Sequence, residues 1–400
     1  MKTTLSVSEA RKLALASQGL LRAKPFGSGK AGALAAIRHL GYVQIDTISV
    51  VERAHHHTLW SRVPGYRPEM LNDLQVRDRQ IFEYWSHAAA YLPMEDYRFC
   101  LPRMQAIAAG EKHWYEPDKK LMQNLLDRFK SEGPLMAKDF AAPENHTPGA
   151  WWSWKPAKRA LEQLFIEGKL MVTRRNNFHK VYDLPERVLP DGIDTTVPSK
   201  EEYYRFLIQR AIQANGLATE TEIGYHRKGA RKGIKSELKR MLAAREVVQV
   251  RVHGWDNVTW YTTAEKLNAI PNLRRSRVLR LLSPFDNAII QRKRVLQLFD
   301  FDYQIECYVP APKRKYGYFC LPILWQGTFV GRLDPKADRA TQTLVVKRLV
   351  FEPEFTEVGD LAGPLMQRLR KLAHFNGCDR VVLESVEPAS WHRYLTSVQK

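Results

Sequence analysis

The sequence lacks the features of several large protein classes. No apolar run approaches the length of a membrane-spanning helix, and no basic, amphipathic lipid anchor is evident. Only four cysteines occur in 400 residues, and none has CxxC spacing, so neither a structural zinc site nor a disulfide framework is expected. Gly27-Ser28-Gly29-Lys30 falls short of the GxxxxGK[ST] phosphate loop, and no strand is expected before it. No cofactor is indicated.

Acidic residues are also scarce relative to basic ones. Lys plus Arg number 62 against 43 Asp plus Glu, which gives a formal charge of +19 and an isoelectric point near 9.7. Such an excess points to a polyanionic partner, and without a lipid anchor nucleic acid is favoured over a membrane surface. The start, Met1-Lys2-Thr3-Thr4, leads into a capped helix rather than an apolar signal region. We therefore expect a cytoplasmic, nucleoid-associated monomer.

One stretch, Gly41-Tyr42-Val43-Gln44-Ile45-Asp46-Thr47, organises the rest of the chain. A helical pattern stops at Gly41, and alternation begins at Tyr42, which predicts helix, turn and strand. In a strand Gln44 and Asp46 lie on one face with Cα atoms roughly 6.6–7 Å apart. An amide beside a carboxylate would hold one water or one cationic centre. The alternative is an edge strand with a solvated polar face.

Three consecutive histidines, His55-His56-His57, follow Arg53 and precede Trp60. Neighbours in sequence cannot all face one metal ion, and no HxxxH or HExxH spacing supplies further ligands, so no metal site is predicted. Two interpretations remain, a cluster of donors that lines a polyanion groove and a solvated loop. A metallohydrolase built on this cluster would lose its activity in EDTA.

Two segments share the order helix, helix, helix, hairpin. The first segment begins with a helix marked by Leu121, Leu125, Leu126 and Phe129. A turn at 133–140 leads into a short second helix, and the third helix is 156–167. The hairpin that follows has its strands at 168–173 and 181–184. In the second, the helices are 201–214, a short one after 217–220, and 232–244, and the hairpin strands are 247–252 and 258–262. This order predicts two winged helices after a winged-helix-like amino-terminal unit. If that unit is a degenerate third copy, its wing is the stretch that begins at Gln44. Basic residues outnumber acidic ones in both third helices and wings.

After a linker at 268–272 the pattern changes to short alternating stretches. Strands are predicted at 303–309, 316–324, 328–333 and 343–351, with turns at 326–327 and 335–338, a helix at 360–375 and a last strand at 380–383. These predict a small barrel or curled sheet. The fold class is therefore α+β, tandem winged-helix motifs followed by a small C-terminal β-barrel. The predicted domains are 1–115, 116–190, 191–267 and 268–400.

Five motifs together resemble the YcaQ branch of the winged-helix DNA glycosylases, the AlkZ/YcaQ interstrand-crosslink glycosylase family. They are Gln44-Ile45-Asp46-Thr47-Ile48, Glu83-Tyr84-Trp85-Ser86-His87, Trp151-Trp152-Ser153-Trp154-Lys155-Pro156, Leu282-Ser283-Pro284-Phe285-Asp286 and Pro310-Ala311-Pro312-Lys313-Arg314-Lys315-Tyr316-Gly317-Tyr318. The resemblance implies excision of N7-alkylated guanine, including the unhooking of interstrand crosslinks. The catalytic signature of the family is Gln-apolar-Gln or Gln-apolar-Asp, and Gln44 and Asp46 match the second form.

The chemistry of this lesion suits one amide and one carboxylate. An N7-alkylguanine already carries positive charge, so it leaves without the protonated acid that an O-glycosidase needs. Asp46 would stabilise the oxocarbenium charge on the sugar and accept a proton from water, and Gln44 would position that water. No lysine stands in the motif to form a Schiff base, so a monofunctional hydrolase is expected.

The expected partner is double-stranded DNA that carries alkylated or crosslinked guanine. A winged-helix transcriptional regulator without catalytic activity is the alternative, but an unpaired carboxylate such as Asp46 near phosphates would cost a pure DNA binder affinity. The residues predicted to contact DNA are basic groups around the motifs: Arg53, His55, Lys155, Lys158, Arg159, Arg292, Lys293, Arg294, Lys313, Arg314 and Lys315.

Overall fold

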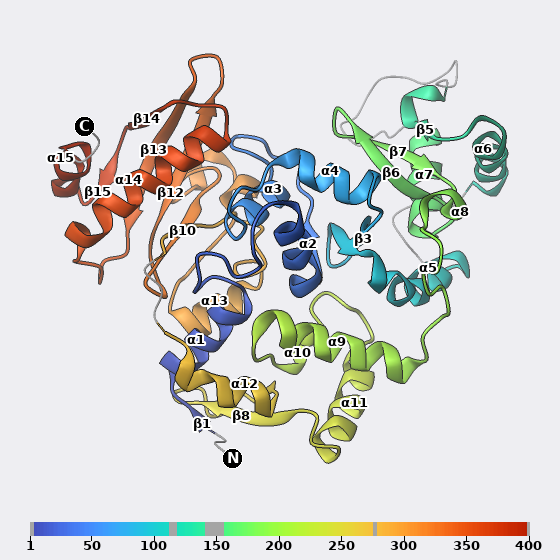
Figure 1. Cartoon of the computed structure of the whole chain (residues 1–400), viewed down its shortest axis with the longest axis horizontal. Helices are drawn as coiled ribbons and strands as arrows, with labels where there is room; N and C mark the ends of the chain where they lie inside the picture. Colours follow the sequence, from blue (N-terminus) through green and yellow to red (C-terminus); the bar gives the residue numbers. More distant parts are fainter. Residues whose placement is uncertain (1–3, 112–117, 141–155, 275–277, 398–400) are drawn as a thin grey trace. The chain divides into compact units, whose positions relative to one another are not determined.

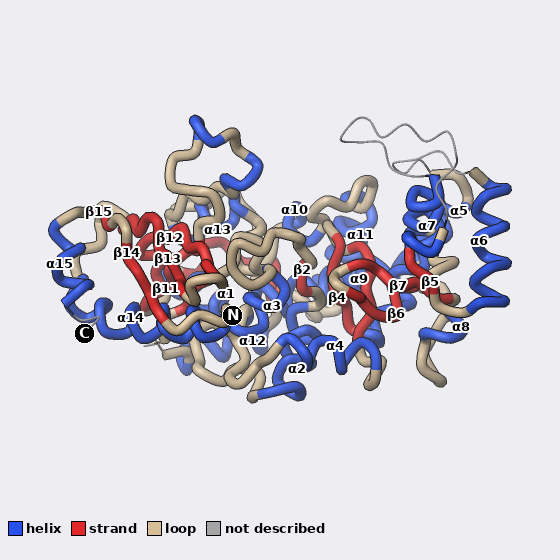
Figure 2. Tube along the Cα trace, turned by 90° about the horizontal axis from the view of Figure 1, so that it is seen from above, coloured by secondary structure: helices blue, strands red, loops and turns tan. Residues whose placement is uncertain are grey.

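The computed structural model describes residues 4–111, 118–140, 156–274 and 278–397, and the chain divides into two compact units (Figures 1 and 2). Unit 1 combines Met1–Arg67 with Leu207–Lys400, and unit 2 is Pro68–Phe206. Unit 2 is thus an insertion in the sequence of unit 1. The four predicted domains stay a prediction.

Unit 1 opens with two helices whose ends the sequence specifies. Ser6 caps α1 in a complete capping box with Glu9, and α2 ends at Gly41, whose φ of +78° is the left-handed conformation typical of a helix C-cap. The first part of unit 1 contains β1 (Thr4–Leu5), α1 (Val7–Ser17), α2 (Gly29–Leu40), β2 (Val43–Gln44) and α3 (Ala54–Trp60).

The second part of unit 1 begins within α9 (Lys200–Asn215), which starts in unit 2. The segment that follows has the predicted order of helices and hairpin. Its elements are α10 (Glu220–Ile223), α11 (Arg231–Ala243), β8 (Val248–Val252), β9 (Trp260–Thr262), α12 (Ala264–Ala269) and η3 (Ile270–Asn272). β1 adds a parallel strand to the β8–β9 hairpin, a pairing that the sequence did not indicate.

A curled sheet with the order β10-β11-β12-β13-β14 forms the carboxy-terminal part of unit 1, and β15 pairs with β13. The described strands leave two edges, so a closed barrel is not confirmed. In Figure 1, α14 lies along this sheet, and its buried face (Leu361, Leu365, Leu369 and Leu372) belongs to the hydrophobic core of unit 1. The elements are β10 (Arg280–Leu281), α13 (Arg292–Phe299), η4 (Glu306–Tyr308), η5 (Ala311–Lys313), β11 (Leu321–Trp325), β12 (Thr328–Asp338), β13 (Thr343–Phe351), α14 (Val358–Phe375), β14 (Arg380–Leu383), β15 (Val386–Glu387) and α15 (Ser390–Ser397).

Two local predictions in this region are wrong. The stretch 303–309 is not a strand, because it forms a loop with the short η4 helix. The predicted turn at 335–338 lies inside β12, where the register shifts between Asp334 and Pro335 and lets the proline stay in the sheet. The turn at Gln326-Gly327 is confirmed, and both residues have positive φ.

Unit 2 carries the first of the two predicted helix and hairpin segments. Asp118 caps α6 by accepting a hydrogen bond from the backbone of Leu121, and β6 and β7 meet at a two-residue turn, Asn177-Phe178. The short second helix is only one 3-10 turn, η2. The elements are α4 (Pro68–Val76), β3 (Ile81–Trp85), β4 (Ala89–Pro93), η1 (Met94–Cys100), α5 (Leu101–Ala108), α6 (Lys119–Glu132), β5 (Leu135–Met136), η2 (Ala137–Asp139), α7 (Pro156–Ile166), β6 (Met171–Asn176), β7 (His179–Asp183) and α8 (Pro185–Val188).

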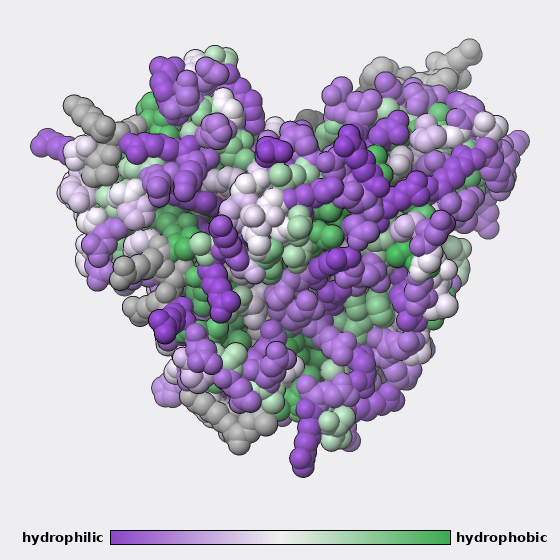
Figure 3. Space-filling model, in the orientation of Figure 1, coloured by the Kyte–Doolittle hydropathy of each residue, from purple (hydrophilic) through white to green (hydrophobic). Residues whose placement is uncertain are grey.

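The surface of the chain is largely polar. Hydrophilic side chains cover most of the face shown in Figure 3. Within the described ranges, no helix is both long and apolar enough to span a bilayer.

Candidate functional site

The stretch with Gln44 and Asp46 follows α2 in unit 1 and is shorter as a strand than predicted. Only Val43–Gln44 is β2, and the chain continues without regular structure through Thr47. Val43 and Ile45 are buried, as the alternation predicts. Gln44 is also buried, at 8% exposure, whereas Asp46 is partly exposed. The burial of Gln44 argues against a fully solvated polar face.

The Asp46 carboxylate lies in a partly desolvated position. Its Oδ1 accepts a hydrogen bond of 2.8 Å from the backbone N–H of Ile48. Burial raises the pKa of Asp46, and the N–H groups of Ile48 and Thr47 partly offset this rise. A carboxylate with a raised pKa accepts a proton more readily than an ordinary aspartate, which suits a general base.

A turn from the curled-sheet region holds the Gln44 segment in place. Asn287 donates a hydrogen bond of 3.0 Å from Nδ2 to the carbonyl oxygen of Tyr42. Next to it, Asp286 binds the guanidinium of Arg62 through two hydrogen bonds of 2.6 and 2.7 Å, and both side chains are fully buried. A bidentate pair of this kind fixes orientation as well as position. We define residues 283–288 as the supporting turn.

Tyr308 and Cys307 lie near Asp46, although more than 250 residues separate them in the sequence. Partial desolvation raises the pKa of Cys307 to about 11 and also raises the pKa of the more exposed Tyr308, and the negative charge of Asp46 contributes to both shifts. Arg292 acts on Tyr308 in the opposite direction. Three groups that the sequence could not connect, Asp46, Tyr308 and Arg292, therefore share one region of unit 1.

The predicted DNA contacts Lys313, Arg314 and Lys315 lie on the same loop as Tyr308. Lys313 and Lys315 are exposed, and Arg314 is partly exposed. The Nε of Arg314 donates to the carbonyl of Val309 at 2.9 Å, and its guanidinium lies over the ring of Tyr318. The basic cluster therefore belongs to the same loop as Tyr308, the residue on which the charge of Asp46 acts.

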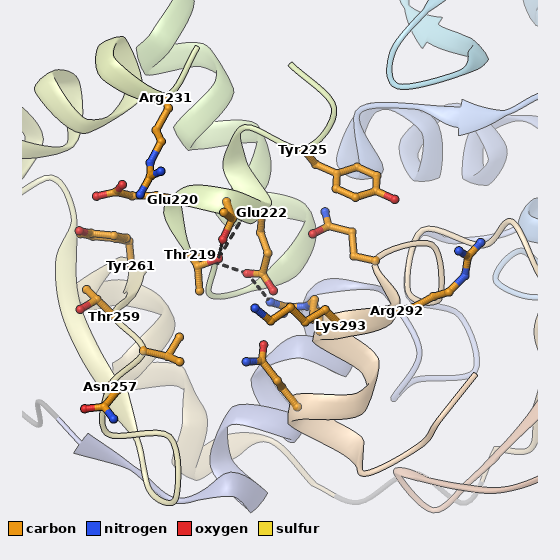
Figure 4. Close-up of a pocket in the computed structure, with 15 residues that line it drawn as sticks. Thr219, Glu220, Glu222, Tyr225, Arg231, Asn257, Thr259, Tyr261, Arg292 and Lys293 are labelled. Atoms are coloured by element: carbon orange, nitrogen blue, oxygen red, sulfur yellow. Dashed lines mark hydrogen bonds and ion pairs between the residues drawn. The ribbon is translucent and has the colours of Figure 1, made fainter. Parts of the chain in front are cut away.

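Arg292 and Lys293 are exposed at the start of α13 and line a pocket of about 540 Å³ (Figure 4). Glu220, Tyr225 and Arg231, among other residues, also line this pocket, and Tyr225 lies on the side of Arg292. These two cations remain candidates for contact with phosphates.

Arg294, which was predicted as a DNA contact, is instead buried and bonded to other parts of the protein. It is 6% exposed, and its guanidinium donates to the carbonyls of Leu217 at 2.9 Å and Asn215 at 2.7 Å. It also pairs with Glu222 at 3.1 Å. A buried guanidinium with these partners joins α13 to the α9–α10 region, so we do not retain it in the proposed DNA surface.

The three histidines belong to helix α3, not to a solvated loop. His56 hydrogen-bonds Tyr66 at 2.7 Å, and His57 hydrogen-bonds the carbonyl of Leu281 at 2.9 Å. Burial lowers the pKa of His56 to about 3 and that of His57 to about 4. His55 is 1% exposed, so its predicted contact with DNA is not retained, whereas Arg53, just before α3, is partly exposed. In the part of the chain that the structure describes, no three His, Cys, Asp or Glu side chains are placed to hold a metal ion.

The remaining predicted contacts belong to unit 2. Lys158 and Arg159 are exposed in the first turn of α7. Lys155, with the tryptophan-rich motif 151–154, lies outside the described residues.

Sequence reasoning missed Tyr308 and the supporting turn's contact with Tyr42. The motif 282–286 is one of the five that carry the family resemblance, but it did not indicate that the turn contacts the segment before Gln44.

Two comparisons with known proteins bear on this site. The model of the DNA glycosylase AlkZ-like family matches residues 37–375, a range that contains both Gln44 and Asp46. The Streptomyces sahachiroi DNA glycosylase AlkZ has a similar structure, with a TM-score of 0.64 over 96% of this chain and 100% of that chain at 16% sequence identity. At this identity the structural match shows a common fold, and the family match covers most of the chain.

Proposed function

Because the chain belongs to the AlkZ-like DNA glycosylase family, we propose that it hydrolyses the N-glycosidic bond of N7-alkylguanine in double-stranded DNA and unhooks interstrand crosslinks through such guanines. The observation that carries this proposal is the placement of Gln44 and Asp46. The two residues lie on one segment whose apolar side chains, Val43 and Ile45, are buried, and the carboxylate of Asp46 is partly desolvated. The tandem winged helices of the predicted fold are part of the same proposal.

In the proposed mechanism, Asp46 acts on the sugar and on water. As the bond between C1′ and N9 breaks, the cationic base leaves as a neutral N7-alkylguanine and takes the bonding electron pair. Asp46 stabilises the oxocarbenium charge that forms on the sugar. Gln44 orients a water for attack at C1′, and Asp46 accepts its proton. No lysine lies in the motif to form a Schiff base, so a monofunctional enzyme is expected.

Substitution of Asp46 by asparagine tests this mechanism. The variant keeps the shape of the side chain but removes its charge, so excision should slow by about 10²–10³-fold. Binding should hardly weaken, because an anion has been removed from a polyanion site. The measurement is single-turnover release of 7-methylguanine, and unhooking of a mustard crosslink, from duplex DNA.

Two further variants make the result specific. Gln44→Ala should lose less activity than Asp46→Asn, because a misplaced water still reacts. Asp379→Asn, which removes an exposed carboxylate elsewhere in unit 1, serves as the matched control and should excise at the wild-type rate. Wild-type excision by Asp46→Asn would remove Asp46 from the mechanism. Tight binding without any base release by the wild-type protein would instead favour a transcriptional regulator.

A further inference from the structure

Tyr308 is unusually exposed for a large aromatic side chain in this protein. It is 71% exposed, whereas the other exposed large hydrophobic side chains in the described ranges, Val197, Leu296, Val382 and Tyr394, are at most 46% exposed. Most aromatic residues of unit 1, such as Phe301 and Phe319, are almost fully buried. A single exposed aromatic side chain is ordinary at a protein surface, but Tyr308 lies near a candidate catalytic carboxylate, which makes its ring a candidate contact for a ligand.

The position of Tyr308 is tied to that of the catalytic segment by the supporting turn. The ring of Phe285 packs edge-on against Tyr308 with a centroid distance of 6.4 Å. Two residues later, Asn287 hydrogen-bonds the carbonyl of Tyr42, which precedes Gln44 and Asp46. One short turn therefore contacts both the exposed ring and the candidate catalytic segment. The electrostatic influence of Asp46 on the Tyr308 hydroxyl agrees with this proximity.

The loop that carries Tyr308 is held closed by two buried carboxylates. Glu306 is 4% exposed and accepts hydrogen bonds from the backbone N–H groups of Lys315, Tyr316 and Gly317 at 2.5, 2.8 and 2.9 Å. Asp334 accepts from the next two N–H groups, those of Tyr318 and Phe319. We call residues 306–318 the closed loop. Because its backbone is fixed at both ends, the ring can bind a ligand without first ordering the loop.

Charge indicates the kind of ligand that this ring selects. The face of a tyrosine ring is electron-rich and attracts a cation. Lys313 and Lys315 on the same loop, and Arg292 nearby, favour the approach of a polyanion. The nearby cations attract an anionic backbone, and the ring of Tyr308 attracts one flat cationic group. DNA that contains N7-alkylguanine has both.

We propose that Tyr308 is a specificity-determining residue whose ring contacts the cationic base of the lesion while Asp46 faces the sugar. This inference rests on the proposed function and adds how the site tells a charged, alkylated purine from an ordinary one. Asp46 responds to charge that develops in the transition state, and Tyr308 responds to charge already present in the ground state.

The first experiment measures excision of 7-methylguanine under single-turnover conditions. Tyr308→Ala should lower the rate at subsaturating enzyme by about 10- to 100-fold, the range found when an aromatic partner of a base is removed. Tyr308→Phe keeps the ring and should stay within about threefold of the wild type. Tyr394→Ala, which removes another exposed tyrosine of unit 1, is the matched control and should behave as the wild type.

The second experiment measures recognition of charge without turnover. In the Asp46→Asn background, binding is compared for duplexes with 7-methylguanine and with 7-deaza-7-methylguanine, which has the same shape but no positive charge. We expect the charged base to be preferred by about 3- to 30-fold. Tyr308→Ala should lose this preference and Tyr308→Phe should keep it.

The two experiments separate this inference from the proposed function. If the wild-type protein releases 7-methylguanine and Tyr308→Ala does so at the same rate, the role of Tyr308 is refuted and the glycosylase function stands. If the wild-type protein releases no base, the proposed function fails, and the binding comparison still decides whether Tyr308 senses charge. An unchanged preference in Tyr308→Ala would overturn the inference.

Discussion

At the scale of single residues, Asp46 carries a charge that the fold disfavours. Burial raises its pKa, so the folded chain disfavours the charged form that the proposed chemistry requires. Ionised Asp46 therefore lowers the free energy of unfolding at neutral pH. This destabilisation disappears as the pH falls through the raised pKa of the folded state, because the folded state then binds the proton more tightly than the unfolded state does.

The upward shift of the Asp46 pKa leads to two predictions. Excision should decline on acidification at a pH above the ordinary aspartate value of about 3.9, because protonated Asp46 cannot accept a proton from water. Asp46→Asn should have a melting temperature equal to or above that of the wild type at pH 7, although it excises slowly. Differential scanning calorimetry at pH 7, with a rate profile over pH 4–8, checks both. A clearly lower melting temperature would show that the charge stabilises the fold.

The sequence located single residues well where a short motif was enough. The Ser6 and Glu9 capping box, the left-handed Gly41 and the inward Val43 and Ile45 all follow from local spacing. It did less well where a side chain has a distant partner. His55 and Arg294 look like donors to DNA in the sequence, yet both are buried, and the partners of Arg294 lie 72 to 79 residues away.

At the scale of elements, the closed loop shows why an alternating pattern was misinterpreted. Tyr303 and Ile305 point inward, as they would in a strand. However, Glu306 also turns inward and accepts three backbone N–H groups from 315–317, so the chain closes on itself instead of pairing. The sequence cannot show this, because a glutamate on an alternating stretch is normally solvated. The curled sheet, with its β-rich alternation, was predictable, but the bulge at Pro335 was not.

Substitution of Glu306 by glutamine tests the importance of the closed loop. The amide has one acceptor oxygen instead of two, so at least one buried N–H loses its partner, at a cost of about 1–3 kcal/mol in stability. Tyr308 should become less ordered, and excision should fall further than the loss of stability explains. Thermal denaturation and single-turnover excision at a temperature where the variant is fully folded are the measurements.

Gly317→Ala perturbs the same loop independently. Gly317 has a φ of +154°, and a Cβ there would meet Asp334. It should reproduce the effect of Glu306→Gln. Normal excision by both folded variants would show that the closed loop has no part in catalysis.

At the scale of the whole molecule, the formal charge of +19 predicts salt-dependent binding to DNA. Arg292→Ala and Lys293→Ala should each lower the slope of log K against log salt by about 0.9 if each side chain contacts one phosphate. Arg294→Ala is the informative comparison, because it removes the ion-pair partner of Glu222 and the donors to the carbonyls of Leu217 and Asn215, and it should cost about 3 kcal/mol of stability. Fluorescence anisotropy over a salt series and thermal melting separate the two effects. A slope unchanged in both exposed variants would remove the start of α13 from the interface.

The insertion of unit 2 into unit 1 also determines when, during synthesis, the site can form. Unit 2 is continuous in sequence, so all of it has been synthesised before Leu207 is added, and it can fold before the second part of unit 1 is complete. The partners of residues 42–62 are synthesised much later. Arg62 hydrogen-bonds Asp286, which lies 224 residues further along the chain, and Asn287, which hydrogen-bonds Tyr42, lies 245 residues after it. The nascent chain therefore carries Gln44 and Asp46 for most of its translation without these partners, and the proposed site cannot assemble until the segment with Asp286 and Asn287 has emerged from the ribosome.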